Sequence, residues 1–325
     1  MSETVALETI YQPVEKRLAR IPDAIFSILS TPNELAQETL RHFFSRQGKY
    51  LRPALTFFGA AMDSQDFLPP AQEEKLLRLA AAFEVFHSAT LIHDDIIDSA
   101  HLRRNIPTIN AKWNAQVAVL VGDYLHDKAI GAIFSAENLR VTSLFLQTAG
   151  TVCDGEIHEL REKNNFDLKE EEYFAIIGKK TAALIACCLE AGGIFAGLAP
   201  EKTAALKRFG WAFGLAFQIV DDYLDFTGQE HEFGKTLGAD CEAGVLTLPL
   251  IRLIQLEGRT QNEIFKPGRF EELKSLLEET GALDYALSRA KQFTDEARLE
   301  LSVFGESAVK SSLERLLDYV LERNR

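Results

Sequence analysis

The sequence predicts an all-α protein that forms a single large helical bundle over residues 1–325. Apolar side chains recur at three- and four-residue steps from Phe83 to Asp94 and again from Leu206 to Leu224, as on the buried face of a helix. No proline interrupts the span from Thr108 to Ala199, which can therefore hold several long helices. Alternating runs bounded by hairpin dipeptides are scarce, and no repeat of solenoid length is present. With 46% hydrophobic residues, the chain can bury a substantial core.

Two segments need separate interpretation. Residues 255–284 are more polar and contain glycine and proline, so we expect them to link the main bundle to a C-terminal helical pair that ends at residues 313–323. Residues 182–199 are the most membrane-like stretch, but they contain Glu190 and are rich in alanine and glycine. This composition favours a tightly packed bundle helix over a bilayer span.

Charge and termini limit the classes of partner. The chain has 35 basic and 48 acidic residues and a formal net charge of −13, which argues against nucleic acid and against general attraction to anionic lipid. Residues 1–4 are polar and acidic, with no basic region followed by an apolar core, so we expect a cytoplasmic protein. The cysteines lack paired metal-ligand spacing, and buried thiols are expected at all four: Cys153, Cys187, Cys188 and Cys241.

Two acidic clusters lie in segments that otherwise have the pattern of apolar helix. Each spells Asp-Asp-x-x-Asp, formed in turn by Asp94, Asp95 and Asp98, and by Asp221, Asp222 and Asp225. On a helix the first and last aspartates lie one turn apart on one face, while the middle aspartate is rotated by about 100°. Carboxylates one turn apart repel by about 1 kcal/mol in water and more in a closed cleft, so a cation is expected between them. Carboxylate oxygens suit Mg²⁺, which usually reaches protein together with substrate phosphates.

Short basic motifs accompany the acidic clusters. Lys49 and Arg52 lie close together before Pro53, where a flexible ammonium and a planar guanidinium can clamp a diphosphate. Taken alone, this motif is explained equally well as a solvated basic turn. The other basic motifs are the doublet Arg103 and Arg104, the run Lys179, Lys180 and Thr181, and a glycine-containing segment with Lys235.

In this order, the motifs resemble the trans-isoprenyl diphosphate synthase family, or polyprenyl synthetases, of the medium- and long-chain type. The resemblance extends from Gly48 to Pro249. It implies a single isoprenoid synthase domain over residues 1–325 with a central active-site cavity. It also implies a prenyltransferase, in which an allylic diphosphate ionises, isopentenyl diphosphate attacks the carbocation, and a proton is lost.

The resemblance also implies roles for individual residues. Leading Mg²⁺ ligands would be Asp94, Asp98 and Asp221, with Asp95, Asp222 and Asp225 completing or orienting a set of about three ions. The allylic diphosphate would be held by Arg103, Lys180 and Lys235, and isopentenyl diphosphate by Lys49, Arg52, His87 and Arg104. Thr181 and Gln218 would turn oxygen dipoles toward the carbocation. Without the family context, His87 is a satisfied core histidine, and Thr181 and Gln218 are partners of nearby backbone.

Product length is expected to depend on the residues one turn before the first acidic cluster. Ala89 and Thr90 are small, whereas family members that make short products tend to have a large aromatic residue there. A methyl group does not block a prenyl tail, so we expect a product of roughly 30 to 50 carbons. Phe86 and Phe145 are the candidate floor residues of the tunnel.

Two positions depart from the family pattern. Val245 stands where a diphosphate-binding lysine is usual, and Glu159 stands where a glutamine is common. The loss of the lysine fits long-chain relatives and lowers the expected affinity for short allylic primers. The change at Glu159 has no explanation in the sequence.

Four alternative functions explain the motifs less completely. A short-chain farnesyl or geranylgeranyl diphosphate synthase would share every motif except the small residues before the first cluster. A class I terpene cyclase would normally lack the second Asp-Asp-x-x-Asp, and a regulatory subunit of a heteromeric synthase usually loses aspartates that are all present here. A metal-binding structural protein leaves the basic motifs unexplained. The family resemblance favours a homodimer, and release of a long product allows transient membrane contact.

Overall fold

The computed structural model describes residues 7–46, 48–63, 68–228, 238, 241, 243–258 and 270–322. Its N-terminal half contains α1 Leu7–Tyr11, η1 Gln12–Val14, α2 Glu15–Leu18, α3 Ile21–Ile28, α4 Glu34–Phe43, α5 Leu51–Ala61, α6 Pro70–Ile97, β1 Leu102–Arg103, β2 Ile106–Pro107, α7 Ile109–Lys112, α8 Ala115–Phe134 and α9 Leu139–Glu162. The remainder contains α10 Glu170–Ile177, η2 Gly178–Ala182, α11 Ala183–Phe195, α12 Pro200–Thr227, α15 Leu248–Glu257, α17 Phe270–Glu279, α18 Ala282–Glu300, η3 Leu301–Val303 and α19 Ala308–Glu322. The expected all-α fold class is confirmed.

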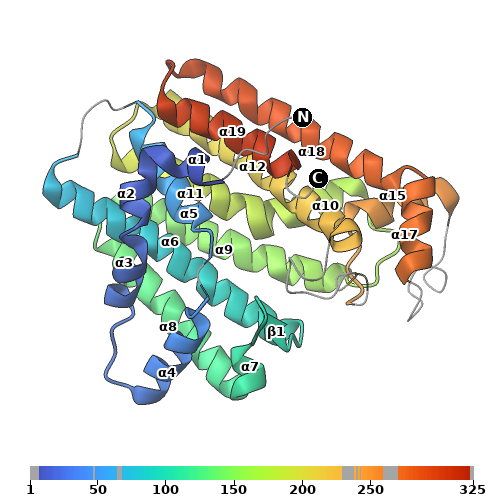
Figure 1. Ribbon diagram of the computed structural model, residues 1–325, viewed down its shortest axis with the longest axis horizontal. Helices are drawn as coiled ribbons and strands as arrows, with labels where there is room; N and C mark the ends of the chain where they lie inside the picture. The colour runs from blue at the N-terminus through green and yellow to red at the C-terminus, as the bar shows by residue number, and fades with distance from the viewer. Residues whose placement is uncertain are drawn as a thin grey trace.

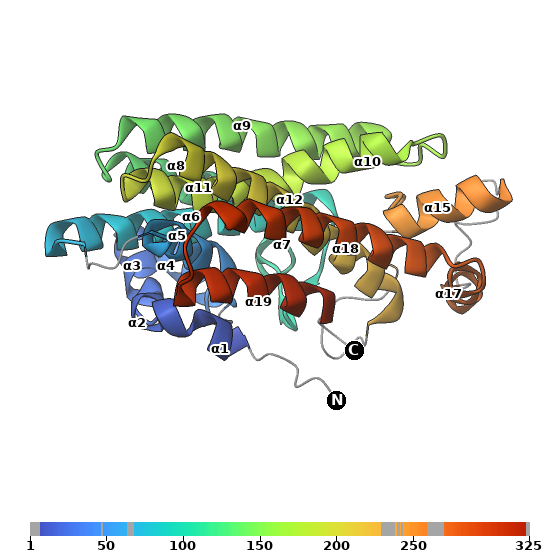
Figure 2. The ribbon, with the colours of Figure 1, turned by 90° about the horizontal axis from the view of Figure 1, so that it is seen from above.

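Helices α6 and α12 are the two long helices that carry the acidic clusters (Figure 1). Helix α6 packs mainly against α8, and α12 packs against α11 and α18. From above, α11 and α12 lie between α9 and α10 on one side and α18 and α19 on the other (Figure 2). Each long helix begins with a proline in its first turn, Pro70 or Pro200, where the missing N–H costs no hydrogen bond.

Helix α11 lies close to its neighbours because small residues line the contacts. A Cβ atom at Gly210 of α12 would lie 2.6 Å from the Cα of Ala186, and one at Gly59 of α5 would lie 2.2 Å from the carbonyl oxygen of Leu189. Only glycine permits such approach. The expected tightly packed helix is therefore present, and no helix within the described ranges is long and apolar enough to cross a membrane.

A two-stranded antiparallel hairpin follows α6, and the sequence analysis did not predict it. Leu102 pairs with Pro107 and Arg103 with Ile106. The turn residues Arg104 and Asn105 have φ values of 51° and 63°, the left-handed conformation that a two-residue hairpin turn requires. The turn lacks glycine, so its sequence gave no strong hairpin signal.

The C-terminal region differs in part from expectation. The helical pair is present as α18 and α19, but the segment expected to be a linker also contains α17. One core cluster extends from Ile10 to Val320 and joins the first and last helices to the bundle. Cys187, Cys188 and Cys241 are buried as expected, whereas Cys153 is exposed on α9, so that expectation was wrong for this thiol.

Candidate active site

The outer and middle aspartates of each acidic cluster have different environments. Asp95 and Asp222 are each only 4% exposed. The first and last aspartates of each cluster are partly or fully exposed: Asp94, Asp98, Asp221 and Asp225. Since residues one turn apart share a helix face, the first and last aspartates of each cluster lie on one face of the helix end and the middle aspartate is turned into the protein.

Asp94 lies in an environment that disfavours its charge. Burial and the nearby carboxylate of Glu156 raise the pKa of Asp94 to about 7, although Lys180 and Arg103 act in the opposite direction. A bound cation would relieve this excess of carboxylate. Glu156 lies on α9, and the sequence analysis did not identify it as a site residue.

Asp95 connects the first acidic cluster to the hairpin. The Nε of Arg103 donates to both carboxylate oxygens of Asp95 at 2.8 and 2.9 Å, and its Nη2 lies 2.7 Å from Oδ1. Such a fork-like pair is strong and directional. Two predicted site residues, one a metal-shell candidate and the other an allylic-diphosphate candidate, therefore contact each other and fix the hairpin beside α6.

Asp222 of the second acidic cluster accepts hydrogen bonds from side chains outside the cluster. The Tyr173 hydroxyl donates to Asp222 Oδ2 at 2.6 Å, and the Gln218 amide nitrogen donates to Oδ1 at 2.8 Å. The Thr181 hydroxyl in turn donates to the Gln218 amide oxygen at 2.7 Å. The network fixes the orientation of the Gln218 amide and leaves the Thr181 oxygen able to accept. Tyr173 had no signal in the sequence.

The segment Gly178–Ala182 forms a π-helical turn between α10 and α11. Such a turn re-aims the side chains of a helix and is frequent at functional sites. It places Lys180 beside Asp94 and the adjacent Thr181 beside Gln218, so one turn connects the two acidic helix ends. Helix α9 fits against it through Gly155, where a Cβ atom would lie 2.6 Å from the Lys180 backbone nitrogen.

Lys180 is paired with two glutamates of α9. Its Nζ lies 2.8 Å from Glu156 Oε2 and 2.5 Å from Glu159 Oε1. Burial alone would lower the pKa of Lys180, but Glu159, Glu156 and Asp94 more than reverse this effect and raise the pKa. Lys180 is therefore charged, as an anion-binding residue must be.

A second group of basic side chains surrounds His87 of α6. Burial lowers the pKa of His87 well below its usual value, and the charges of Arg52, Arg103 and Arg104 act in the same direction. Its imidazole is therefore neutral and can donate one hydrogen bond. These side chains are four of the predicted diphosphate-binding residues, and the structure brings them together.

A small pocket adjoins this cationic group. Its lining includes Gly48, Tyr50, Glu84, Ser88 and Arg104. Glu84 is buried, and its burial raises its pKa against the opposing effect of Arg52 and Arg104. The sequence analysis missed Glu84, which looked like one polar residue within an apolar helix.

Lys49 lies at the edge of the site, under the last helix. Its Nζ donates to the Tyr319 hydroxyl of α19 at 3.2 Å and lies 5.8 Å from the centre of that ring. The C-terminal helix thus covers the side on which isopentenyl diphosphate is expected. Lys235, the remaining predicted cation, lies outside the described residues.

The candidate floor residues meet two turns before Asp94. The Phe86 and Phe145 rings lie 5.0 Å apart at an interplanar angle of 83°, and Phe83 lies 5.9 Å from Phe145. Ala89 is buried one turn nearer the aspartates, and Thr90 bonds the backbone oxygen of His87 at 2.9 Å. Ala89 therefore lies between the aromatic group and the aspartates along α6.

Comparison with known proteins gives the family. The model of the polyprenyl synthetase family matches residues 33–279. The chain belongs to this family.

Individual members of the family match this chain over nearly the whole length of both proteins. The chain is 33% identical to an all-trans-nonaprenyl-diphosphate synthase of Rhodobacter capsulatus over 97% of this chain and 98% of that protein. It is also 33% identical to a short chain isoprenyl diphosphate synthase of Methanothermobacter thermautotrophicus, covering 94% of each. A polyprenyl synthase structure from Caulobacter crescentus, complexed with calcium and isoprenyl diphosphate, has a TM-score of 0.93 at 29% identity and covers all of both chains. The comparisons confirm the resemblance, and with it an enzyme of the prenyl diphosphate synthase class.

The acidic residues of this family member fit a hard divalent cation. The four outer aspartates offer only carboxylate oxygens, the ligands that such ions prefer. The carboxylate surplus around Asp94 is the observation that a bound cation explains.

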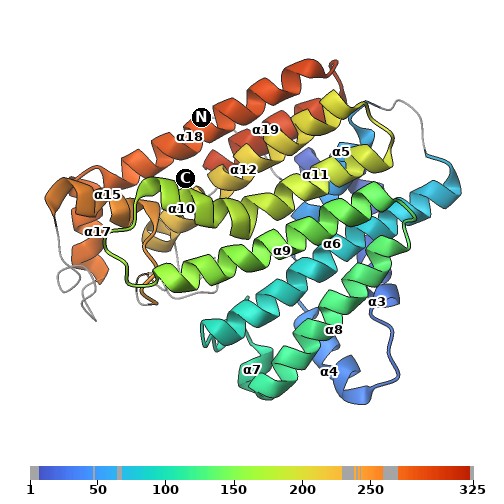
Figure 3. The same cartoon turned by 180° about the vertical axis from the view of Figure 1, so that it is seen from behind.

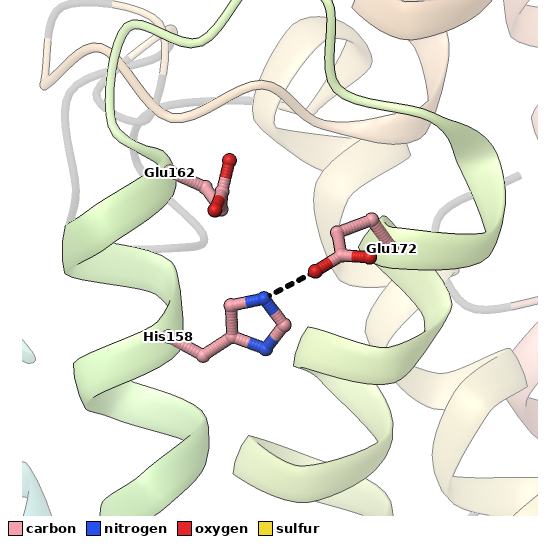
Figure 4. A group of neighbouring side chains, drawn as sticks. All are labelled: His158, Glu162 and Glu172. Atoms are coloured by element: carbon pink, nitrogen blue, oxygen red, sulfur yellow. Dashed lines mark hydrogen bonds and ion pairs between the residues drawn. The ribbon is translucent and has the colours of Figure 1, made fainter.

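Another possible metal group lies elsewhere on α9 and α10. His158, Glu162 and Glu172 place ligand atoms within 4.8 Å of one another (Figure 4). The His158 Nε2 already contacts Glu172 at 2.6 Å, and the Arg161 guanidinium contacts all three side chains. These side chains therefore form an ion-pair network in which Arg161 is the cation.

Proposed function

We propose that this polyprenyl synthetase condenses isopentenyl diphosphate with an allylic diphosphate and produces a medium- or long-chain all-trans polyprenyl diphosphate. The observation that carries the proposal is the π-helical turn, which sets Lys180 and Thr181 between two acidic helix ends. A separate cationic group with Arg52, His87 and Arg104 lies beside it. One site for a leaving diphosphate and one for a retained diphosphate are what this condensation requires.

The allylic diphosphate would bind at the acidic helix ends. Mg²⁺ held by Asp94, Asp98 and Asp221, in a set of about three ions, would supply Lewis acidity to the departing diphosphate. Lys180 would hold that anion, with Arg103 and Lys235 as further candidates. Asp95, Asp222 and Asp225 would complete or orient the metal shell, since Asp95 fixes Arg103 and Asp222 fixes Gln218.

The carbocation would face oxygen atoms that do not attack it. The Thr181 hydroxyl donates a hydrogen bond to the Gln218 amide oxygen, so the lone pairs of the hydroxyl oxygen can face the carbocation and stabilise it electrostatically. The Gln218 amide is held from both ends and does not rotate freely. The Thr181 hydroxyl donates to an amide oxygen, which is too weak a base to make the hydroxyl a nucleophile.

Isopentenyl diphosphate would bind in the second cationic group. Arg52 and Arg104 provide planar forks for phosphate oxygens, and neutral His87 provides a hydrogen bond without repelling them. Lys49 would close the pocket together with α19. A pocket without carboxylate-held metal suits this diphosphate, because it must stay attached to its carbon.

Product analysis tests the function. We expect purified protein with Mg²⁺, isopentenyl diphosphate and farnesyl or geranylgeranyl diphosphate to yield chains longer than about 25 carbons, because the small Ala89 would not block a prenyl tail. Chromatography of the dephosphorylated products measures this directly. Products that stop at about 15 or 20 carbons would favour the short-chain alternative. Turnover only with a second, different chain would favour the regulatory-subunit alternative.

We also propose a cytoplasmic homodimer. The outer face of α9 carries exposed apolar residues at steps of seven, eleven and three residues, which keep them on one side of the helix: Leu139, Leu146, Ile157 and Leu160. Exposed apolar side chains in such a row are typical of an interface. Figure 3 shows α9 beside α8, and α8 adds exposed Leu120 and Phe134. We propose only transient membrane contact for product release, since a net charge of −13 does not favour anionic lipid.

A further inference from the structure

A buried tyrosine of α10 belongs to the hydrogen-bond network of the second acidic cluster. Tyr173 is only 3% exposed, and its hydroxyl lies 2.6 Å from Oδ2 of Asp222, which is itself 4% exposed. A hydrogen bond to a buried carboxylate is stronger than one between neutral groups. The pair joins α10 to the end of α12 that carries the candidate metal ligands. Tyr173 therefore fixes the side of the Asp222 carboxylate that faces α10.

The network returns to the helical segment that carries Tyr173. Asp222 Oδ1 accepts from Gln218 at 2.8 Å, and the Gln218 amide oxygen accepts from Thr181 at 2.7 Å. Tyr173 and Thr181 lie eight residues apart on the continuous run of α10 and η2. One contacts Asp222 and the other contacts Gln218, the two α12 side chains that are bonded to each other. A displacement of Asp222 would therefore move the Gln218 amide, and with it the Thr181 hydroxyl.

The π-helical turn explains how both ends of the network can reach α12. In an uninterrupted α-helix, residues eight apart are rotated from each other by about 80°. The π turn Gly178–Ala182 adds one residue to the helix between them, which brings the rotation to within about 20°. Tyr173 and Thr181 therefore lie on one face of the helix, and their hydrogen bonds show that this face is turned toward α12.

We propose that Tyr173 is a positioning residue for ionisation of the allylic diphosphate. By holding Asp222 and the Gln218 amide, it sets the direction of the Thr181 oxygen that would face the carbocation. This inference rests on the proposed function. Loss of the tyrosine hydroxyl would remove one donor from a buried carboxylate and allow the carboxylate, the amide and the threonine hydroxyl to reorient together. The substrates would keep their cationic partners, so the rate of ionisation should fall while the affinity stays.

The test measures the single-turnover rate of allylic diphosphate consumption with saturating isopentenyl diphosphate and Mg²⁺, together with the KM of both diphosphates. Tyr173→Phe removes only the hydroxyl, and we expect the rate to fall about tenfold while both KM values stay within about twofold of wild type. The matched control is Tyr285→Phe, because the Tyr285 hydroxyl also donates to a carboxylate of α10, at 2.6 Å from Oε2 of Glu170. This control should keep the rate within about twofold of wild type.

A double-mutant cycle shows whether Tyr173 acts through the network. Thr181→Val removes the hydroxyl at the far end, and the rate of the Tyr173→Phe/Thr181→Val double variant should equal that of Thr181→Val within about twofold. p-Aminophenylalanine at position 173 keeps a donor in the place of the hydroxyl and should keep the rate within about threefold of wild type. This last variant also decides the question if Tyr173→Phe does not fold.

The outcomes separate this inference from the proposed function. An unchanged rate in folded Tyr173→Phe overturns the inference, as do additive effects of the two substitutions. It is also overturned if Tyr285→Phe slows the reaction as much as Tyr173→Phe, or if p-aminophenylalanine in a folded protein slows it about tenfold. Wild type that consumes no allylic diphosphate in the presence of isopentenyl diphosphate and Mg²⁺ instead removes the proposed function, and the inference with it.

Discussion

At the scale of single residues, burial separates groups that the sequence presents as equivalent. The six aspartates of the two clusters have the same motif context, yet Asp95 and Asp222 are buried and hydrogen-bonded while the first and last aspartates of each cluster keep exposed surface. An enclosed carboxylate is stable only with such partners. The middle aspartates therefore fix Arg103 and Gln218, and the outer aspartates are the candidate ligands of an ion.

His87 gives a prediction of stability against pH. Its folded pKa lies well below the usual value because of burial and three arginines, so the unfolded chain binds a proton that the folded chain does not. Below about pH 6.5, down to the lowered pKa, the free energy of unfolding should therefore fall with decreasing pH, by about 1 kcal/mol per pH unit from this group. His87→Gln should remove that part of the slope in urea titrations between pH 5 and 7. At pH 8 both forms are neutral, so any difference there reports packing alone. An unchanged acid slope would contradict the neutral assignment.

Ala89 gives a prediction of product length. Ala89→Phe places a ring between the aspartates and the Phe86–Phe145 contact, and a prenyl tail would stop there. Chromatography should show shorter products, while the initial rate of allylic diphosphate consumption stays within about threefold of wild type because the charged residues are untouched. Products of unchanged length would place the blocking position elsewhere.

At the scale of elements, close helix contacts place the candidate catalytic side chains. The π-helical turn sets both Lys180 and Thr181, and it can approach α9 only because residue 155 is glycine. The hairpin after α6 sets Arg103 and Arg104 in the same way, through two residues with positive φ. Neither element has a strong local signal, since both are maintained by contacts with distant segments.

Gly155 and Gly150 on α9 provide a matched pair of variants. Gly155→Ala would put a methyl group 2.6 Å from the Lys180 nitrogen and 2.8 Å from the Lys179 Cβ, so the π turn must shift. We expect a loss of about 1–3 kcal/mol in unfolding free energy. The kcat should fall further than in a variant that loses the same stability without moving Lys180. Gly150→Ala meets nothing within 4 Å and should stabilise the helix by about 0.5–1 kcal/mol with unchanged activity. Equal effects of the two variants on kcat would show that the close contact does not position Lys180.

At the scale of the whole molecule, the core ties the ends of the chain to the site. Ile10 and Val320 belong to one cluster of buried residues, and α19 reaches Lys49 through Tyr319. The apolar row on α9 lies on the outside, where no described segment of the same chain covers it. A second copy of the chain would bury this row on the same helix that carries Glu156 and Glu159.

Charge introduced into this row should separate the proposed dimer. Leu146→Glu and Ile157→Glu replace side chains that are 48% and 60% exposed, so the monomer has little reason to unfold. We expect light scattering with size exclusion to report twice 36.3 kDa for wild type and a shift toward 36.3 kDa for these variants. Leu299→Glu, at a 72% exposed position on α18, should leave the assembly intact. A wild-type mass of one chain would contradict the homodimer.

The sequence by itself determined the helical class, the two acidic helix ends and the family, because each depends on residue type and short spacing. Apolar periodicity specified α6 and α12, and the aspartates within them specified the ion class. Only the tertiary structure decided which aspartates face outward and that a π turn connects the clusters. It also revealed Glu84, Tyr173 and the two glutamates around Lys180. These features arise where segments distant in the chain exclude water together, and no local pattern records which side chains will meet.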